Sequence, residues 1–132
     1  MSGTLVAADV RVVWDDIRPG LEHTRLKAGA LWRPEDVYAA CVSGAAALYV
    51  GEPGFVVVQR RVNALTGVPE LLVWIAYSRA PGSIESFQPA VDALAREHGF
   101  SRLSMWSNRR GFERVPGWHK VASVFEREVP HE

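Results

Sequence analysis

The sequence lacks the features that mark secreted and membrane proteins. It contains one cysteine, Cys41, in 132 residues, which excludes an internal disulfide and is typical of a reducing compartment. Because its neighbours are small and apolar, Cys41 is interpreted as a core thiol. No apolar run reaches membrane-spanning length, and the N-terminus has no basic region followed by an apolar one. We therefore expect a cytoplasmic protein with no membrane partner.

An excess of charge of either sign is also lacking. Acidic and basic residues number 15 each, so the chain has no net field that would attract nucleic acid. The arginine cluster Arg109, Arg110 and Arg114 is interpreted as a solvated helix face or as a phosphate contact, since the guanidinium fork suits phosphate. As a nucleic-acid patch it is too small and too diluted by Glu113. No histidine or cysteine has a partner at metal-ligand spacing, so no metal site is predicted.

What is present is an ordinary globular composition with one strong apolar run. The hydrophobic fraction is 48% and the charged fraction 23%, and the length predicts a single domain over residues 1–132. Glu70–Tyr77 is rich in β-favouring residues and shows no clean alternation, which predicts a central strand covered on both faces. Pro81 and Gly82 end this strand in a turn.

A helix is predicted directly after this strand. Ser83 is a suitable N-cap, the helical pattern runs from Ile84 to His98, and Gly99 ends it. Its first N–H groups would lie at the carboxyl end of the strand, where phosphates bind readily. The apolar residues of this helix recur at helical spacing and predict a buried face that includes Phe87, Val91 and Leu94.

The other segments complete an ordered series of elements. The series begins with a strand over residues 4–14 and a polar helix over 21–31 that starts or breaks at Pro19–Gly20. A second helix follows the turn at Trp32–Asp36, has Pro34 in its first turn and stops at Ser43–Gly44. After it come strands over 45–50 and 55–62, the central strand and its helix, a strand over 101–106, a short helix over 107–115 and a final strand over 119–128. Short turns predict antiparallel hairpins, and the strand–helix–strand unit predicts parallel neighbours. We therefore expect an α+β protein in three layers, with a mixed, mostly antiparallel sheet and helices on both faces.

This order resembles that of the GNAT (Gcn5-related N-acetyltransferase) superfamily over nearly the whole chain. Trp106–Asn108, followed by a short helix and Gly117–Trp118, is similar to the family's asparagine after the parallel strand and its later Gly-Phe pair. Trp14–Pro19 and Trp32–Tyr38 are similar to segments of small GNAT-like proteins of tailed phages, some of which are internal virion proteins. The resemblance implies a GNAT fold, acetyl-CoA as cofactor and an amine as acceptor.

The resemblance also implies where a cofactor and catalytic groups would lie. The catalytic candidates are Glu70, Tyr77 and His119. Glu70 is interpreted as a general base or as a solvated carboxylate at the end of the strand. Tyr77 is interpreted as a contact on the cofactor side or as a packed aromatic. His119 could be a general base near neutral pH, or it could simply be an exposed side chain. Glu70 and Tyr77 are an odd number of residues apart, which places them on opposite faces of a strand without a bulge. The cofactor contacts are expected at Ala76, Tyr77, Ser78, Arg79, Gly82, Ser83, Asn108 and Arg109.

The turn after the central strand departs from the family pattern. Active members have Gly-x-Gly or Gly-x-Ala there, because the backbone approaches the pyrophosphate of acetyl-CoA closely. Here the turn has a single glycine, Gly82, and Pro81 removes a donor, although Arg79 and Ser83 could still contact phosphates. This predicts weak acetyl-CoA binding or none.

Two functional interpretations remain open at this point. One is a GNAT-fold protein with a degenerate cofactor site that acts through its surface, with protein partners or by self-association. If it is phage-encoded, it would be an assembly or internal virion protein in the virion or the host cytoplasm. The other is an active small N-acyltransferase that transfers acetyl from acetyl-CoA to an unknown amine.

Overall fold

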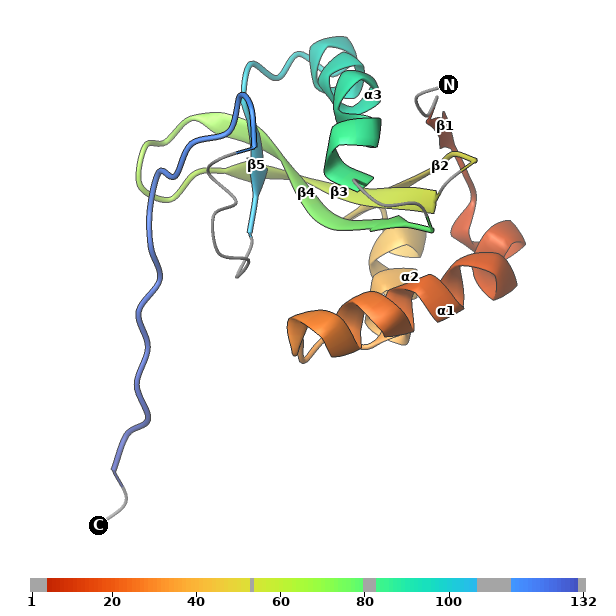
Figure 1. The fold of residues 1–132 in the computed structure, drawn as a ribbon, viewed down its shortest axis with the longest axis horizontal. Helices are drawn as coiled ribbons and strands as arrows, with labels where there is room; N and C mark the ends of the chain where they lie inside the picture. The colour runs from red at the N-terminus through yellow and green to blue at the C-terminus, as the bar shows by residue number, and fades with distance from the viewer. Residues whose placement is uncertain (1–4, 53, 80–82, 107–114, 131–132) are drawn as a thin grey trace.

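A computed structural model describes residues 5–52, 54–79, 83–106 and 115–130, with the side chains of 83–86 left out. Its five strands form one sheet, with α1 and α2 against one face and α3 against the other (Figure 1). This confirms the predicted mixed, mostly antiparallel sheet with helices on both faces. The elements are β1 (Val6–Ala7), α1 (Val10–Ala28), α2 (Pro34–Ser43), β2 (Ala47–Val50), β3 (Gly54–Val62), β4 (Pro69–Ser78), α3 (Ser83–Glu97) and β5 (Leu103–Met105).

The strands are arranged in the order β1-β2-β3-β4-β5, and each pairs with its neighbours in sequence. The first three pairs are antiparallel, whereas β4 and β5 are parallel and are connected by α3. The predicted hairpins and the predicted parallel pair are therefore confirmed. Within the described residues β5 pairs with Leu71–Val73 only, while β4 continues to Ser78. The two strands thus lose contact toward the carboxyl end of β4, as expected.

A β-bulge interrupts β4 at Trp74. Val73 and Ile75 pair with consecutive residues of β3, so Trp74 between them is the extra residue. A bulge changes which face the following side chains occupy. Val73 accordingly packs in the core beneath α3, whereas Ile75 packs in the core on the α1 and α2 side.

Each face of the sheet carries its own apolar core. The core beneath α3 includes Phe87, Val91 and Leu94, which confirms the predicted buried face of that helix. On its outer side Arg96 is exposed, as expected, but Asp92 is half-buried. The opposite core consists of Val10, Ile17, Leu21, Val37, Ala46, Leu48, Phe55, Val57 and Ile75.

The strand predicted over residues 4–14 is mostly wrong. β1 occupies two residues, and α1 begins at Val10 after Asp9, which caps it by accepting a hydrogen bond from the Arg11 backbone N–H at 2.9 Å. The alternation that suggested a strand is short, and the longer helical spacing prevails because it buries one face of α1. The residues that α1 buries are Val10, Ile17, Gly20 and Leu21.

The helix also continues through Pro19, where we expected a start or a break. A proline inside a helix removes one backbone hydrogen bond. The next residue, Gly20, lets α1 approach the sheet closely, since a Cβ there would lie 2.8 Å from both the Phe55 and the Tyr77 ring. Close packing on the sheet therefore holds α1 in one piece.

The final strand predicted over residues 119–128 does not form in the structure. These residues are described, adopt no regular structure and are exposed. Figure 1 shows the segment leaving the body of the molecule and running away from the helices and the sheet. The prediction was wrong because alternation makes a strand possible but does not supply the neighbour that a strand needs. Most of the short helix predicted over 107–115 lies outside the described residues.

Candidate functional site

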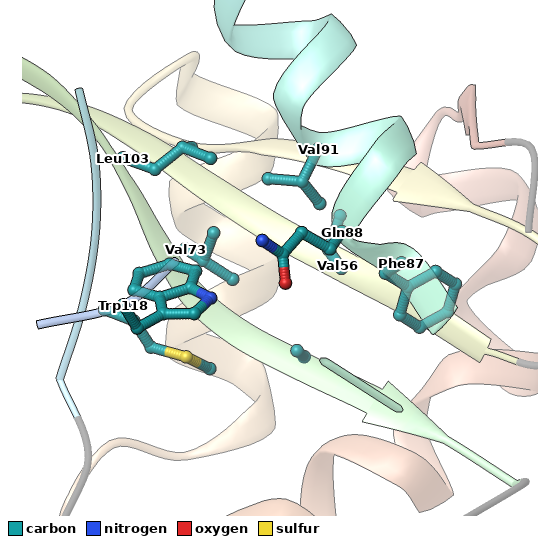
Figure 2. Close-up of a pocket in the computed structure, with 9 residues that line it drawn as sticks. Val56, Val73, Phe87, Gln88, Val91, Leu103 and Trp118 are labelled. Atoms are coloured by element: carbon teal, nitrogen blue, oxygen red, sulfur yellow. The ribbon is translucent and has the colours of Figure 1, made fainter. Parts of the chain in front are cut away.

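An apolar pocket lies between α3 and the sheet, where β4 and β5 separate. Figure 2 shows Gln88 projecting from α3 into this space, with Trp118 on the other side. The described lining contains no titratable side chain, so the pocket is suited to an uncharged, largely apolar ligand. Its lining residues are Val56, Val73, Ala76, Phe87, Gln88, Val91, Leu103, Met105 and Trp118.

The backbone of β4 borders this pocket. Beyond the bulge, residues 75–77 pair with β3, and no described strand pairs with their other side. Alternate backbone groups of a strand point to opposite sides, so some N–H and C=O groups of this stretch face away from β3. An extended ligand with amide groups could pair with such an edge as an additional strand.

The first turn of α3 lies next to the same end of β4. α3 begins at Ser83, so its unpaired N–H groups follow directly on the turn that ends β4. In this turn Arg79 is exposed and donates a hydrogen bond from Nη1 to the Glu52 carbonyl at 3.4 Å. Ser78 is half-buried, and Gly82 lies outside the described residues. The helix thus begins at Ser83, the residue we expected as its N-cap, one residue before the expected start at Ile84. Phe87, in the next turn of α3, lines the pocket.

The expected cofactor residues fall on different sides of the sheet. Ala76 lines the pocket. Tyr77 points to the α1 side, with its ring centroid 5.5 Å from that of Phe55 and 5.8 Å from that of His23. This is the arrangement of a packed aromatic. Asn108 and Arg109, with the rest of the arginine cluster, lie outside the described residues.

Glu70 is the one charged side chain among the buried residues of the described chain, at 7% exposure. It starts β4 opposite Arg61 of β3. The bulge at Trp74 places Glu70 and Tyr77 on the same face, so our expectation of opposite faces is wrong. At about 3.3 Å per residue they are still about 20 Å apart, which excludes one site that uses both. His119 is exposed in the C-terminal segment and does not line the pocket.

Sequence reasoning missed Gln88 and Trp74. Gln88 is the polar side chain of the helix that enters the pocket, and nothing in its spacing distinguishes it from a solvated position. Trp74 lies within a continuous apolar run, where a bulge leaves no local signal. Trp118 was singled out only through the resemblance, as the aromatic of a Gly-aromatic pair.

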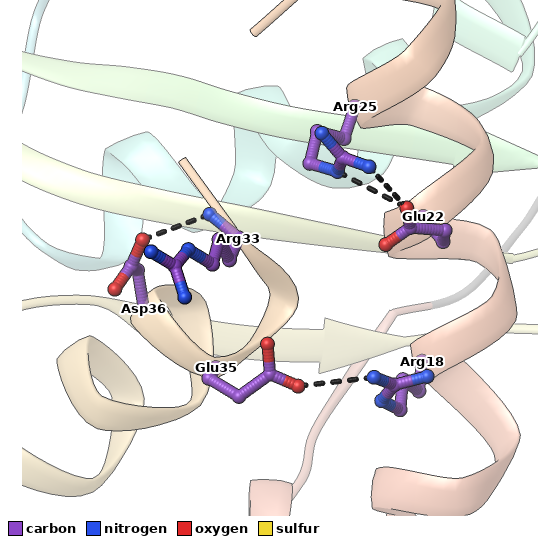
Figure 3. A network of polar contacts seen from close by, with 6 residues as sticks. All are labelled: Arg18, Glu22, Arg25, Arg33, Glu35 and Asp36. Atoms are coloured by element: carbon purple, nitrogen blue, oxygen red, sulfur yellow. Dashed lines mark hydrogen bonds and ion pairs between the residues drawn. The ribbon is translucent and has the colours of Figure 1, made fainter. Parts of the chain in front are cut away.

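The two tryptophan-containing segments Trp14–Pro19 and Trp32–Tyr38 pack α1 and α2 against each other and against the sheet. Trp14 packs edge-on against Tyr38 at 4.9 Å between ring centroids, and Trp32 packs against Trp74 of the bulge at 6.2 Å. Charged residues of α1 and of α2, and the residue before α2, contribute polar contacts between and within the helices (Figure 3). These contacts are Arg18 to Glu35 at 3.1 Å, Arg25 to Glu22, and the Arg33 N–H to the Asp36 carboxylate at 2.8 Å.

Other sites are weakly supported in the described part of the chain. Cys41 is half-buried against the α1 and α2 core, and burial raises the pKa of its thiol, which disfavours a nucleophile. Among the described residues no group of three or more His, Cys, Asp or Glu side chains could hold a metal ion. None of the helices described is both long and apolar enough to cross a membrane.

Comparison with known proteins identifies the fold. No protein-family model matches the sequence, and no curated protein is similar to it. Solved structures match over almost the whole chain. A ribosomal-protein-alanine N-acetyltransferase from Brucella melitensis biovar Abortus 2308 has a TM-score of 0.65 and 17% identity, covering 97% of this chain and 100% of that chain.

Two further structures belong to the same group of similar folds. The aminoglycoside acetyltransferase meta-AAC0020 from an uncultured soil metagenomic sample has a TM-score of 0.63 and 10% identity, covering 98% of this chain and 97% of that chain. An integron cassette protein from V. cholerae has a TM-score of 0.63 and 15% identity, covering 98% and 94%. The chain therefore has the fold of the GNAT acetyltransferases, which confirms the predicted fold.

Proposed function

We propose that this chain is a GNAT-fold protein with a degenerate acetyl-CoA site, which acts through its surface as a phage assembly or internal virion protein. The observation that carries the proposal is the pocket beneath α3. Its described lining is apolar and provides no acid or base. A site without such groups fits a GNAT-fold protein that does not catalyse acetyl transfer.

The phosphate end of the site is weakened by the turn between β4 and α3. Pro81 has no N–H, and one glycine, Gly82, stands where the family has two small residues. Loss of two hydrogen bonds to a charged acceptor, at about 1.5–3 kcal/mol each, lowers affinity by about two orders of magnitude or more. Arg79 uses one N–H of Nη1 for its contact with the Glu52 carbonyl, so its other N–H groups could compensate for part of this loss.

The catalytic candidates do not meet at the pocket. Glu70 lies at the far end of β4, Tyr77 lies on the opposite face of the sheet, and His119 lies in the exposed C-terminal segment. A general base must come within hydrogen-bond reach of the proton that it removes. The positions of these three side chains therefore favour a binding role over catalysis.

The phage assignment is supported by the similarity of Trp14–Pro19 and Trp32–Tyr38 to phage proteins. In this chain Trp14 of α1 packs against Tyr38 of α2, and Trp32, which precedes α2, packs against Trp74 of β4. The similarity of these segments therefore supports the same packing of α1 and α2 in this chain as in the phage proteins. A surface role then depends on protein partners or on self-association.

The second candidate function is an active N-acyltransferase. The open edge of β4 and the adjacent start of α3 favour it, because together they offer backbone groups to a pantetheine chain and to phosphates. Glu70 would then be the base for an amine bound on the α1 and α2 side. Amine acceptors such as aminoglycosides are suggested by the fold's similarity to an aminoglycoside acetyltransferase.

Calorimetric titration with acetyl-CoA distinguishes the two candidates. We expect no binding heat below millimolar cofactor for the wild-type chain. Arg79→Ala tests the turn, and Arg102→Ala, an exposed arginine at the start of β5, is the matched control. A micromolar dissociation constant that Arg79→Ala weakens at least tenfold, and that Arg102→Ala leaves unchanged, would overturn the proposal and restore the acyltransferase.

A further inference from the structure

The C-terminal segment 119–130 has the pattern of a strand but no neighbour in the structure. In an extended chain the odd-numbered positions share one face, which carries Val121, Phe125 and Val129 together with His119, Ser123 and Arg127. The other face carries Ala122 and Val124 among Lys120, Glu126 and Glu128. The odd-numbered face thus holds most of the large apolar side chains, a distribution compatible with a sheet strand that has this side covered.

The apolar side chains of this segment are strongly exposed. Phe125 is 90% exposed and Val124 is 91% exposed, and Val121 and Val129 are also exposed. Large apolar side chains gathered on an exposed segment mark a surface that binds a partner. The structure leaves this surface uncovered by any described part of its own chain.

The outer edge of β5, at the end of the sheet, can accept an additional strand. The N–H of Leu71 donates to the Arg102 carbonyl at 3.0 Å, so Arg102 and, two residues later, Ser104 direct their backbone groups toward β4. Leu103 and Met105 consequently direct theirs away from β4. No described strand pairs with that side of β5.

Side chains next to this edge suit the segment. Leu103 and Met105 are half-buried and belong to the apolar layer beneath α3. A strand added here with Val121 and Phe125 on the same face would continue that layer. Trp106, just past β5, is exposed, with the Arg61 guanidinium 4.3 Å above its ring. It offers further apolar surface beside the edge.

We propose that residues 119–130 of one chain add as a strand to the outer edge of β5 in a second copy. The second copy is the occupant because the segment leaves the body of its own molecule after Trp118 (Figure 1). Each copy has one such segment and one such edge. Two copies related by a two-fold axis can therefore exchange their segments, and the β5 edge of each copy then gains one strand. The inference deepens the proposed surface function by naming the surface and the partner, and it is independent of acetyl-CoA binding.

Light scattering after size exclusion tests the exchange with a matched pair of variants. Phe125→Asp and Val124→Asp alter neighbouring positions of nearly equal exposure on opposite faces of the segment. We expect the wild-type chain at micromolar concentration to have twice the 14.6 kDa mass of one chain. Phe125→Asp should weaken the dimer at least tenfold, and Val124→Asp less than threefold.

Hydrogen exchange identifies which edge is used and by which chain. The amides of Leu103 and Met105 should be protected in the dimer and should lose protection on dilution. Protection in a monomer would show that the segment pairs with its own β5, which overturns the proposal. A monomer with unprotected amides, or a dimer equally insensitive to both variants, overturns it as well. None of these results depends on acetyl-CoA, so failure here is distinct from failure of the proposed function.

Discussion

Replacement of Gly20 by alanine should destabilise the protein, although alanine is the better helix former. Gly20 lies inside α1, where glycine costs about 1 kcal/mol relative to alanine. An added Cβ would, however, lie 2.8 Å from Phe55 Cε2 and 2.8 Å from Tyr77 Cδ2. These distances are well below the optimal separation of about 3.5–4.0 Å between carbon atoms.

The magnitude follows from how little the two rings can move. Phe55 is 2% exposed, and Tyr77 is held between Phe55 and His23. Overpacking at such a site costs about 1–3 kcal/mol, and three short contacts place the cost toward the upper part of this range. After the helix-propensity gain, the net loss should be about 1–2 kcal/mol. For a domain of this size the Tm should fall by about 3–10 °C.

Thermal unfolding followed by circular dichroism measures this loss. Ala39→Gly, at an exposed position of α2, gives the size of the propensity effect alone. In a Tyr77→Leu background the same Gly20→Ala change should cost less, because one of the two rings is gone. A higher Tm for Gly20→Ala in the wild-type background would refute the close approach of α1 to β4.

Three further predictions concern the core, a helix cap and the thiol. Phe87→Ala removes a side chain of α3 that is 2% exposed against the sheet, and it should lower the free energy of unfolding in urea by about 3–5 kcal/mol. An unchanged unfolding midpoint would mean that a different face of α3 is buried. The hydrogen bond from the Arg11 side chain lowers the pKa of Asp9 below its ordinary value of 3.8. The stabilisation of the folded state by the Asp9 carboxylate is therefore present above about pH 4 and is lost as the pH falls through the folded-state pKa of Asp9. When unfolding is measured over a series of pH values, the Asp9→Asn variant should not show this loss. Cys41, whose thiol pKa is raised by burial, should react with a thiol reagent at pH 7 more slowly in the folded protein than in urea; equal rates would contradict its position.

The sequence alone determined the elements whose patterns are local and long. β4 was predictable because a continuous apolar run bounded by turn residues describes a strand with both faces covered. α3 was predictable because its apolar residues repeat with the helical period, and the parallel pairing of β4 with β5 follows from the crossover that this helix makes. The first strand was assigned wrongly because a few alternating residues, Val10 to Trp14, also fit the start of a helix.

The candidate site was only partly visible in the sequence. Ala76 was expected at the cofactor side and lines the pocket, but Tyr77 beside it packs on the other face. The bulge at Trp74 decides which face each residue of β4 occupies, and a bulge is a property of the pairing with β3. Gln88 and Trp118 come together only because α3 and the C-terminal segment approach the same stretch of β4.

The segment after Trp118 shows most clearly what only the tertiary structure decides. Its alternation predicted a final strand, yet the structure leaves residues 119–128 without one. Side-chain periodicity is encoded residue by residue, so it can be read from the chain. A strand's hydrogen bonds come from a neighbouring strand, and which neighbour is available depends on the folded sheet and its exposed edges.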